Sequence, residues 1–220
     1  MLNVFRIAGD LSHLASIFIL LQTIKKTRQV DGISLKTQFL YLLVFCTRYL
    51  DLLTFHWRSI YNTVMKMVFI GSSVYVVNLM QQCKITNPVG YRDMLVRDTF
   101  QIKYLIGASA LLALFFRTKF TILELCWTFS IWLESIAILP QLFMLSKSGR
   151  ADTLTTHYIF ALGLYRALYI PNWIWRYYTE EGRFDTNSVV AGIIQTALYS
   201  DFFYIYYKRV FKGKNFNLPV

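Results

Sequence analysis

The sequence VFRIAGDLSHLASIFILLQTI (Val4–Ile24) is a mostly apolar stretch, long enough to cross the hydrocarbon core of a bilayer as one helix. Six further stretches of this kind follow it: Leu35–His56, Ile60–Gln82, Phe100–Phe116, Phe120–Ser146, Leu154–Tyr178 and Ser188–Phe211. We therefore predict an all-α fold, a bundle of seven transmembrane helices in one domain of residues 1–220 with a short cytosolic tail at 212–220. Hydropathy alone does not decide between six and seven spans, because Lys103 shortens the fourth stretch.

The composition supports a membrane protein. Of 220 residues, 55% are hydrophobic and only 16% are charged, which leaves too few charges to cover a soluble domain of this size. The formal net charge is +11, but the basic residues do not form one patch or stripe. We therefore do not expect a nucleic-acid partner. We expect membrane lipids as partners instead.

The basic residues instead alternate from loop to loop. Most lie after the first, third and fifth stretches and in the tail: Lys25, Lys26, Arg28, Lys36, Lys84, Arg92, Arg97, Lys147, Arg150, Lys208, Arg209, Lys212 and Lys214. The opposite side holds Arg58, Arg117, Lys119 and Arg183. The positive-inside rule then predicts a lumenal N-terminus and a cytosolic C-terminus, which also favours an odd number of spans. The first stretch lacks a basic leader and a cleavage site, so we expect it to be retained.

A weak internal correspondence accompanies this topology. Arg48 follows Arg6 by 42 residues, and Arg166 follows Glu124 by the same interval. Two parallel three-helix repeats joined by the fourth helix would explain it, as in SWEET transporters. The polar segment Cys83–Phe100, with Pro88 and Gly90, is suited to the linker between such halves.

Ionisable side chains are numerous inside the apolar stretches. Each costs about 2.5–3.5 kcal/mol at mid-bilayer, so such residues usually face a bundle interior or a water-filled cavity. The set is Arg6, Asp10, His13, Arg48, Asp51, Lys66, Lys103, Glu124, Glu134, Arg166, Arg176 and Asp201. Glu134 is expected to be neutral or paired.

Helical spacing places many of these residues on one face of each of four helices. The four sets are Arg6, Asp10 and His13; Arg48 and Asp51; Glu124, Trp127 and Glu134; and Tyr165, Tyr169, Asn172, Trp173 and Arg176, with Arg166 beside the last. We expect the four faces to meet in a cavity that opens to the lumen. His13, Glu134 and Tyr165 should lie at its floor.

Two interpretations of these charges stay open at this point. They are either internal ion pairs that fix helix packing, such as Arg6 with Asp10 or Arg48 with Asp51, or groups that bind a ligand. Buried ion pairs contribute little net stability, which favours a ligand. Arginine binds carboxylates through two parallel hydrogen bonds, so the arginines indicate an anionic ligand, and Asp51 and Glu124 could meet a cationic group on it. Trp127 and Tyr165 could equally be ordinary aromatic packing.

Five segments resemble the KDEL receptor family, its fungal type in particular. They are distributed along nearly the whole chain: FRIAGDLSHL (Phe5–Leu14), TRYLDL (Thr47–Leu52), WTFSIWLESIAILPQL (Trp127–Leu142), TTHYIFALGLYRALYIPNWIWR (Thr155–Arg176) and YSDFFYIYY (Tyr199–Tyr207). The resemblance implies a SWEET/PQ-loop fold with Pro140 and Gln141 as its PQ element. It also implies a receptor of the ER and Golgi membranes that binds C-terminal retrieval tetrapeptides in the acidic Golgi and releases them in the neutral ER.

The resemblance further implies residue roles. Arg48 would bind the terminal carboxylate, and Arg6, Arg166 and Arg176 the acidic side chains. Asp51, Glu124 and Trp127 would meet the fourth residue from the end, and the aromatic stripe adds Tyr169 and Trp173 to the binding set. His13, Glu134 and Tyr165 resemble a pH-responsive cluster, since histidine titrates where organelle pH varies. Asp201 matches a carboxylate needed for transport. Three lysines of the tail, Lys208, Lys212 and Lys214, resemble a signal that recruits the COPI coat. The simpler interpretation of these lysines is that they anchor the tail on the cytosolic side by the positive-inside rule.

The main alternative is a SWEET/PQ-loop-like transporter of small solutes, which would need access from both sides of the membrane. An enzyme is not expected, because neither H-E-x-x-H nor G-x-S-x-G occurs, and no cofactor or metal is expected either. His56, Trp57 and Arg58 depart from the animal pattern of the family. The preferred fourth residue of the ligand therefore stays open, although His56 and Arg58 would tolerate an acidic one.

Overall fold

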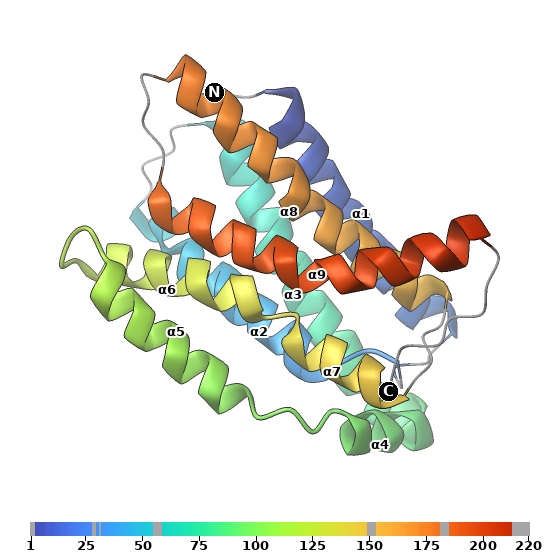
Figure 1. Cartoon of the computed structure of the whole chain (residues 1–220). Helices are drawn as coiled ribbons and strands as arrows, with labels where there is room; N and C mark the ends of the chain where they lie inside the picture. The colour runs from blue at the N-terminus through green and yellow to red at the C-terminus, as the bar shows by residue number, and fades with distance from the viewer. Residues whose placement is uncertain are drawn as a thin grey trace. The chain divides into compact units, whose positions relative to one another are not determined.

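The computed structural model describes residues 3–27, 30, 32–54, 59–148, 153–180 and 185–212, and every regular element within these ranges is a helix (Figure 1). The elements are α1 (Val4–Thr27), α2 (Leu35–Arg48), the 3-10 helix η1 (Leu50–Thr54), α3 (Ile60–Thr86), α4 (Pro88–Arg97), α5 (Ile102–Phe116), α6 (Ile122–Ile136), α7 (Leu139–Ser148), α8 (Thr153–Thr179) and α9 (Thr186–Lys212). The predicted all-α class is confirmed.

Several of these helices are suited to a bilayer. Among the described residues, Val4–Lys26, Ile60–Thr86 and Ile122–Lys147 are each long and apolar enough to cross a membrane. The pair Pro88–Arg97 and Ile102–Phe116 meets the same criterion together, with a bend of 56° between its helices. The chain is thus a helical membrane protein, while the count of seven spans stays a prediction.

Two of the predicted spans are not continuous helices. The stretch Phe120–Ser146 divides into α6 and α7 just before Pro140. Proline has no N–H and its ring clashes with the carbonyl four residues earlier, here that of Ile136, where α6 ends. The stretch Leu35–His56 likewise ends its α-helix at Arg48 and continues as η1. Arg48 and Asp51 therefore do not share one helical face, and that prediction was wrong.

The polar segment between the predicted halves contains a helix of its own. Asn87 caps α4, because its side chain accepts a hydrogen bond from the Gly90 N–H, and Pro88 occupies the first turn, where a missing N–H costs nothing. The helix is short and has two buried apolar residues, Tyr91 and Met94. Hydropathy did not predict it, since most of its side chains are polar or exposed.

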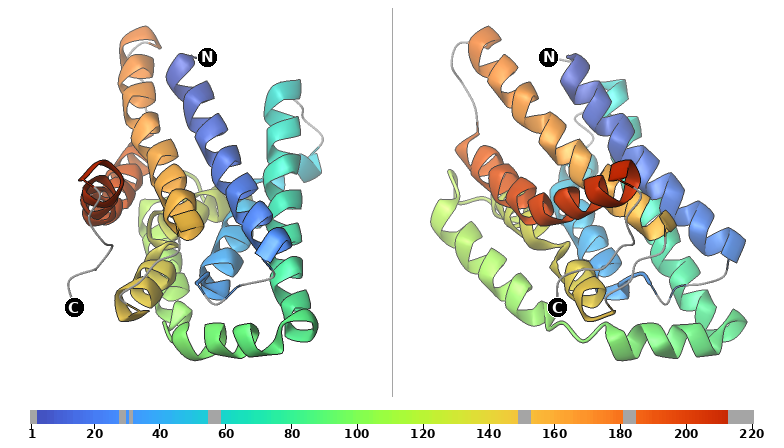
Figure 2. Two further views of the ribbon diagram at one scale, coloured as in Figure 1. Left: turned by 90° about the vertical axis from the view of Figure 1, so that its right-hand side faces the viewer. Right: turned by 45° about the vertical axis from the view of Figure 1, so that its right-hand side comes forward.

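One compact unit consists of Met1–Arg28 and Leu145–Val220 and contains α1, α8 and α9. Helices α1 and α8 lie side by side in Figures 1 and 2 and run antiparallel. Three polar contacts mark the register: the Asn3 side chain donates to Asn172 at 2.8 Å, the Tyr169 hydroxyl to Asp10 at 2.7 Å, and the Ser12 hydroxyl to the Ala161 carbonyl at 2.9 Å. The partner numbers on α8 fall as those on α1 rise.

The other unit, Gln29–Met144, packs α2 against α3 and α6. Gln141 at the start of α7 is fully buried and holds the start of α2 by three hydrogen bonds. Its side chain accepts from the Ser34 N–H at 2.8 Å and donates to the Gly32 carbonyl at 3.0 Å, while its N–H donates to the Thr37 hydroxyl at 3.0 Å. The PQ element is therefore a structural clamp on this end of α2.

Asp98 holds the same end of α2 from the segment after α4. Its carboxylate accepts hydrogen bonds from the Ser34 hydroxyl and the Lys36 N–H, both at 3.0 Å, while the Lys36 ammonium donates to the Phe100 carbonyl at 2.8 Å. Ser34 is in turn the N-cap of α2. Asp98 is only 3% exposed, so these donors have little access to water in its place.

We expect Asp98→Ala to lower the free energy of unfolding by about 1–3 kcal/mol, because it leaves a buried hydroxyl and a backbone N–H without their acceptor. Thermal unfolding of the purified full chain in detergent measures this loss. Asp93→Ala is the matched control, since it removes the same charge from an exposed position on α4. Equal thermal stability of the two variants would contradict the predicted role of Asp98.

Candidate functional site

A charged cavity of about 460 Å³ lies in the unit Gln29–Met144, where α2 ends and α6 begins. Its lining comes from α2, η1, α3 and α6 and includes Arg48, Tyr49, Asp51, Lys66, Glu124 and Trp127. Four of these, Arg48, Asp51, Glu124 and Trp127, are predicted binding residues. The structure therefore brings together the predicted residues that belong to this unit, apart from Glu134, which lies beneath Arg48 rather than in the lining.

Arg48 is held by α6 at the inner side of the cavity. Its Nη1 forms an ion pair with the Glu134 carboxylate, and its Nε donates to the Ser130 hydroxyl at 3.1 Å. Glu134 is 1% exposed, so its carboxylate depends on contacts within the protein, and the ion pair with Arg48 is one of them. The Arg48–Asp51 pair, an example under the ion-pair interpretation, does not form, because the α-helix ends at Arg48 and the two side chains have different partners.

One nitrogen of the Arg48 guanidinium does not take part in these contacts. Its Nη2 is buried and has no hydrogen-bond partner among the described residues. A buried guanidinium nitrogen without an acceptor is costly, and a carboxylate entering the cavity would provide the acceptor. The geometry is thus suited to binding an anionic group at this point.

Asp51 and Lys66 form a second ion pair, which links η1 to α3. The Lys66 ammonium also lies 5.7 Å from the centre of the Tyr49 ring. The sequence placed Lys66 among the charges of the apolar stretches but not among the site residues. Helical spacing could not pair it with Asp51, because the two residues lie on different elements.

Glu124 has a local structural role as well as a place in the lining. Thr121 caps α6 by accepting a hydrogen bond from the Glu124 N–H, the T-x-x-E arrangement of a capping box. The Glu124 carboxylate accepts from the Thr118 hydroxyl at 2.6 Å. No cation within the described residues is within ion-pair distance of it, which leaves it able to meet a positive group.

The unit of α1, α8 and α9 carries a second polar cluster. His13 stacks on Tyr165 with ring centroids 4.3 Å apart, and both side chains are buried. Beside them, the Tyr169 hydroxyl donates to Asp10, and the Arg6 Nε lies 4.0 Å from the Asp10 carboxylate. The Arg6–Asp10 pair, an example under the ion-pair interpretation, is therefore present.

Arg166 completes this cluster from α8. Its guanidinium lies 5.1 Å from the Tyr165 ring centre and 5.9 Å from that of Tyr169, distances suited to cation–π contact. Gly9 makes room for the Tyr169 ring, because a Cβ there would lie 2.8 Å from it. Arg6, Asp10 and His13 on α1 thus form one cluster with Tyr165, Arg166 and Tyr169 on α8, and Arg48 and Glu134 form another. The meeting of all four faces, and of Glu134 with His13 and Tyr165, stays a prediction.

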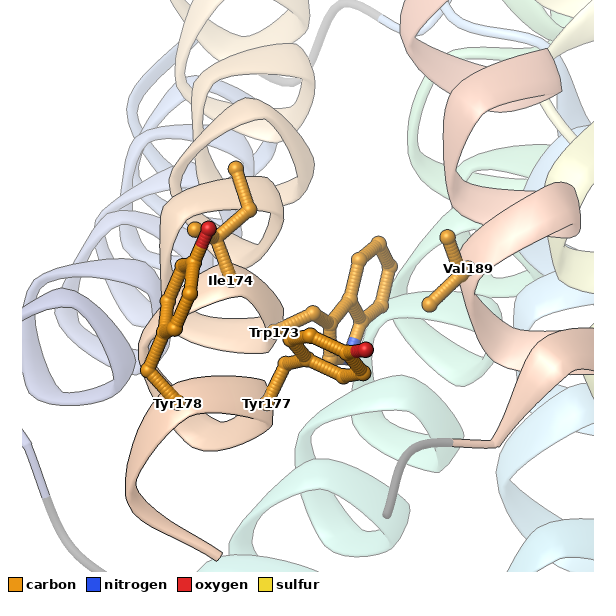
Figure 3. A pocket seen from close by; sticks show the side chains of 5 residues that line it. All are labelled: Trp173, Ile174, Tyr177, Tyr178 and Val189. Carbon is orange, nitrogen blue, oxygen red and sulfur yellow. The ribbon is translucent and has the colours of Figure 1, made fainter. Parts of the chain in front are cut away.

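Trp173 and Arg176 lie farther along α8. Figure 3 shows Trp173 and Tyr177 pointing from α8 toward Val189 on α9, beside an apolar pocket of about 240 Å³. Arg176 is exposed and donates two hydrogen bonds, of 2.8 and 2.7 Å, to the Glu180 carboxylate. These bonds are the largest of the causes that lower the pKa of Glu180 to about 2, so the pair stays charged in mildly acidic solution. The i, i+4 spacing of the two residues could have identified this partner.

The remaining predicted residues have no assigned contacts. Asp201 is exposed on α9. Lys208 and Lys212 belong to the end of α9, without a description of their side chains, and Lys214, His56 and Arg58 lie outside the described residues. Within the described part of the chain, no three His, Cys, Asp or Glu side chains form a group that could hold a metal ion.

Comparison with known proteins adds a family match. The model of the family described as ER lumen protein retaining receptor matches residues 29–176. The chain is 66% identical over 220 residues to the ER lumen protein-retaining receptor of Kluyveromyces lactis, with 100% of both chains covered. It is 63% identical over 218 residues to that of Saccharomyces cerevisiae and 54% identical over 219 residues to receptor 2 of Gallus gallus, in each case covering 99% of this chain and 100% of the relative.

Proposed function

Because the chain belongs to the ER lumen protein retaining receptor family, we propose that it binds the C-terminal H/K/DDEL-type signal of escaped ER residents and returns them to the ER. The relatives are named as receptors, which favours this role over an enzyme or a transporter of small solutes. The observation that carries the proposed ligand is the buried Arg48 Nη2, which has no acceptor among the described residues and belongs to a side chain that lines a charged cavity. The terminal carboxylate of a peptide would be that acceptor.

The other site residues divide by the charge that each would meet. Arg6, Arg166 and Arg176 would bind the acidic side chains of the signal, and Tyr169 and Trp173 would pack against it. Asp51, Glu124 and Trp127 would contact the fourth residue from the end. This division is supported by the cavity, where the Glu124 carboxylate accepts from the hydroxyl and N–H of Thr118 and has no cation of the described residues within ion-pair distance.

Binding in the acidic Golgi and release in the neutral ER would depend on the cluster around His13. A proton on His13 adds positive charge beside Tyr165, Tyr169 and Arg166 on α8 and beside Arg6 and Asp10 on its own helix. An anionic peptide is attracted by that added charge, so its affinity should rise as the pH falls. Binding would then shift the helices between two states of different affinity, a step in which Asp201 would take part.

The membrane arrangement is proposed from the charge pattern. One transmembrane domain of residues 1–220, with seven spans in two parallel three-helix repeats joined by the fourth helix, would place the N-terminus in the ER and Golgi lumen. The tail with Lys208, Lys212 and Lys214 would then face the cytosol. There it could recruit the COPI coat once the ligand-bound state exposes it.

Peptide titration across pH tests the function directly. We expect the full chain in detergent to bind an N-acetylated peptide ending in KDEL, whose lysine stays charged throughout, at least about tenfold more tightly at about pH 5.5 than at about pH 7.4. The matched control is the same peptide with a C-terminal carboxamide, which should lose about tenfold or more in affinity because it forms no charge-assisted bond with arginine. Equal binding of acid and amide would exclude the carboxylate role of Arg48, and equal affinity at both pH values would contradict the pH-dependent step.

A further inference from the structure

We propose that Lys66 is a specificity-determining residue of the receptor: it occupies the acidic part of the cavity in the absence of peptide and competes with the ligand's fourth residue from the end for Asp51. This inference rests on the proposed function and adds a residue to it. Its basis is the ion pair between the Lys66 ammonium and the Asp51 carboxylate, both of which line the cavity.

The charges of the cavity show why Lys66 matters. The Arg48 charge is compensated by Glu134, beneath the lining, and the Lys66 charge by Asp51 within the lining. Among the described residues, the Glu124 carboxylate accepts hydrogen bonds only from the hydroxyl and the backbone N–H of Thr118. While Lys66 pairs with Asp51, Glu124 is the acidic group of the described lining that a cationic ligand residue can meet. Without Lys66, both Asp51 and Glu124 would be open to that residue.

The Lys66–Asp51 pair is open to exchange. The Lys66 side chain is 24% exposed and that of Asp51 is 52% exposed, so water screens their attraction. Asp51 also belongs to the short 3-10 helix η1, which has no buried residues. A ligand cation can thus reach Asp51 at small cost, but it then lies close to the displaced ammonium.

Whether Lys66 raises or lowers the affinity of a peptide depends on the charge of the peptide's fourth residue from the end. A lysine or histidinium four residues from the end would be repelled by Lys66, whereas an aspartate at that position could pair with it. The Tyr49 ring, 5.7 Å from the ammonium, would hold Lys66 near the cavity after it leaves Asp51. Lys66 therefore favours acidic or neutral residues there at the expense of cationic ones.

A charge-removal experiment tests this role. The affinities of N-acetylated peptides ending in KDEL, ADEL and DDEL are measured for the wild-type chain, Lys66→Met and Lys66→Arg at one pH. In Lys66→Met, the KDEL/DDEL affinity ratio should rise about threefold to tenfold, because the two ligands respond to the lost charge with opposite sign. Lys66→Arg keeps the charge and should keep the ratio. Lys103→Met, which removes an exposed charge from α5 outside the cavity lining, is the matched control.

The outcomes separate the possibilities. An unchanged ratio in Lys66→Met, or an equal loss of affinity for all three peptides, would overturn the inference, the second by showing a merely structural role. A wild-type chain that binds none of the peptides would instead contradict the proposed function, and the inference with it. Thermal unfolding checks that each variant is folded. Lys66→Gln, a second uncharged variant, replaces Lys66→Met if the latter is unstable.

Discussion

Replacing Arg48 by alanine is expected to lower the free energy of unfolding by about 3–5 kcal/mol and to abolish measurable peptide binding. The stability loss follows from Glu134, which is 1% exposed and would lose the arginine that forms its ion pair. The binding loss follows from the guanidinium that would meet the terminal carboxylate. Thermal unfolding and calorimetric titration of the same preparation measure the two effects.

A double variant separates folding from binding. Arg48→Ala combined with Glu134→Ala removes both charges of the pair, so it should regain most of the stability that the single variant loses. It should still fail to bind peptide. Glu134→Gln is the complementary control, since its amide oxygen can accept from Arg48 and the guanidinium stays in place. Peptide binding by the folded double variant at wild-type affinity would disprove the role assigned to Arg48.

The helices could be predicted well from hydropathy, but their breaks could not. Helices α1, α3, α5, α8 and α9 begin within two residues of the predicted spans. The sequence stays mostly apolar across the end of α2, so hydropathy does not change there. It therefore could not predict that the helix ends at Arg48. The break before Pro140 carried a local signal, the proline itself. Helix α4 carried one too, in its Asn87–Pro88 cap.

Sequence reasoning identified four residues that line the charged cavity, Arg48, Asp51, Glu124 and Trp127, but not the pairs that the charged residues form. Helical spacing says which side chains share a face, and it grouped Arg6, Asp10 and His13 correctly. It does not say what the face meets. The pairs Arg48–Glu134, Asp51–Lys66 and Asp10–Tyr169 each join different elements, so they follow from tertiary packing rather than from periodicity. Lys66 was left out of the predicted site for this reason.

The second large effect is expected at His13. In the wild-type chain, peptide affinity should fall at least about tenfold between about pH 5.5 and about pH 7.4, and in His13→Ala the change should shrink to about threefold or less. The Arg176–Glu180 pair does not contribute to this change, because the pKa of Glu180 is about 2 and its carboxylate stays charged throughout. His157→Ala is the matched control, since it removes another histidine of the same unit, and it should keep the wild-type pH dependence.

Proton uptake gives a more direct test of the same residue. If the bound peptide stabilises the protonated imidazole, binding near neutral pH must take up a proton, and the affinity then rises as the pH falls. Calorimetry in two buffers of different ionisation enthalpy counts these protons. We expect an uptake approaching about one proton in the wild-type chain and clearly less in His13→Ala. Tyr165→Phe keeps the ring on which His13 stacks and removes only its hydroxyl, so unchanged uptake there would assign the proton to His13 itself. Unchanged uptake in His13→Ala would place the sensor on another group.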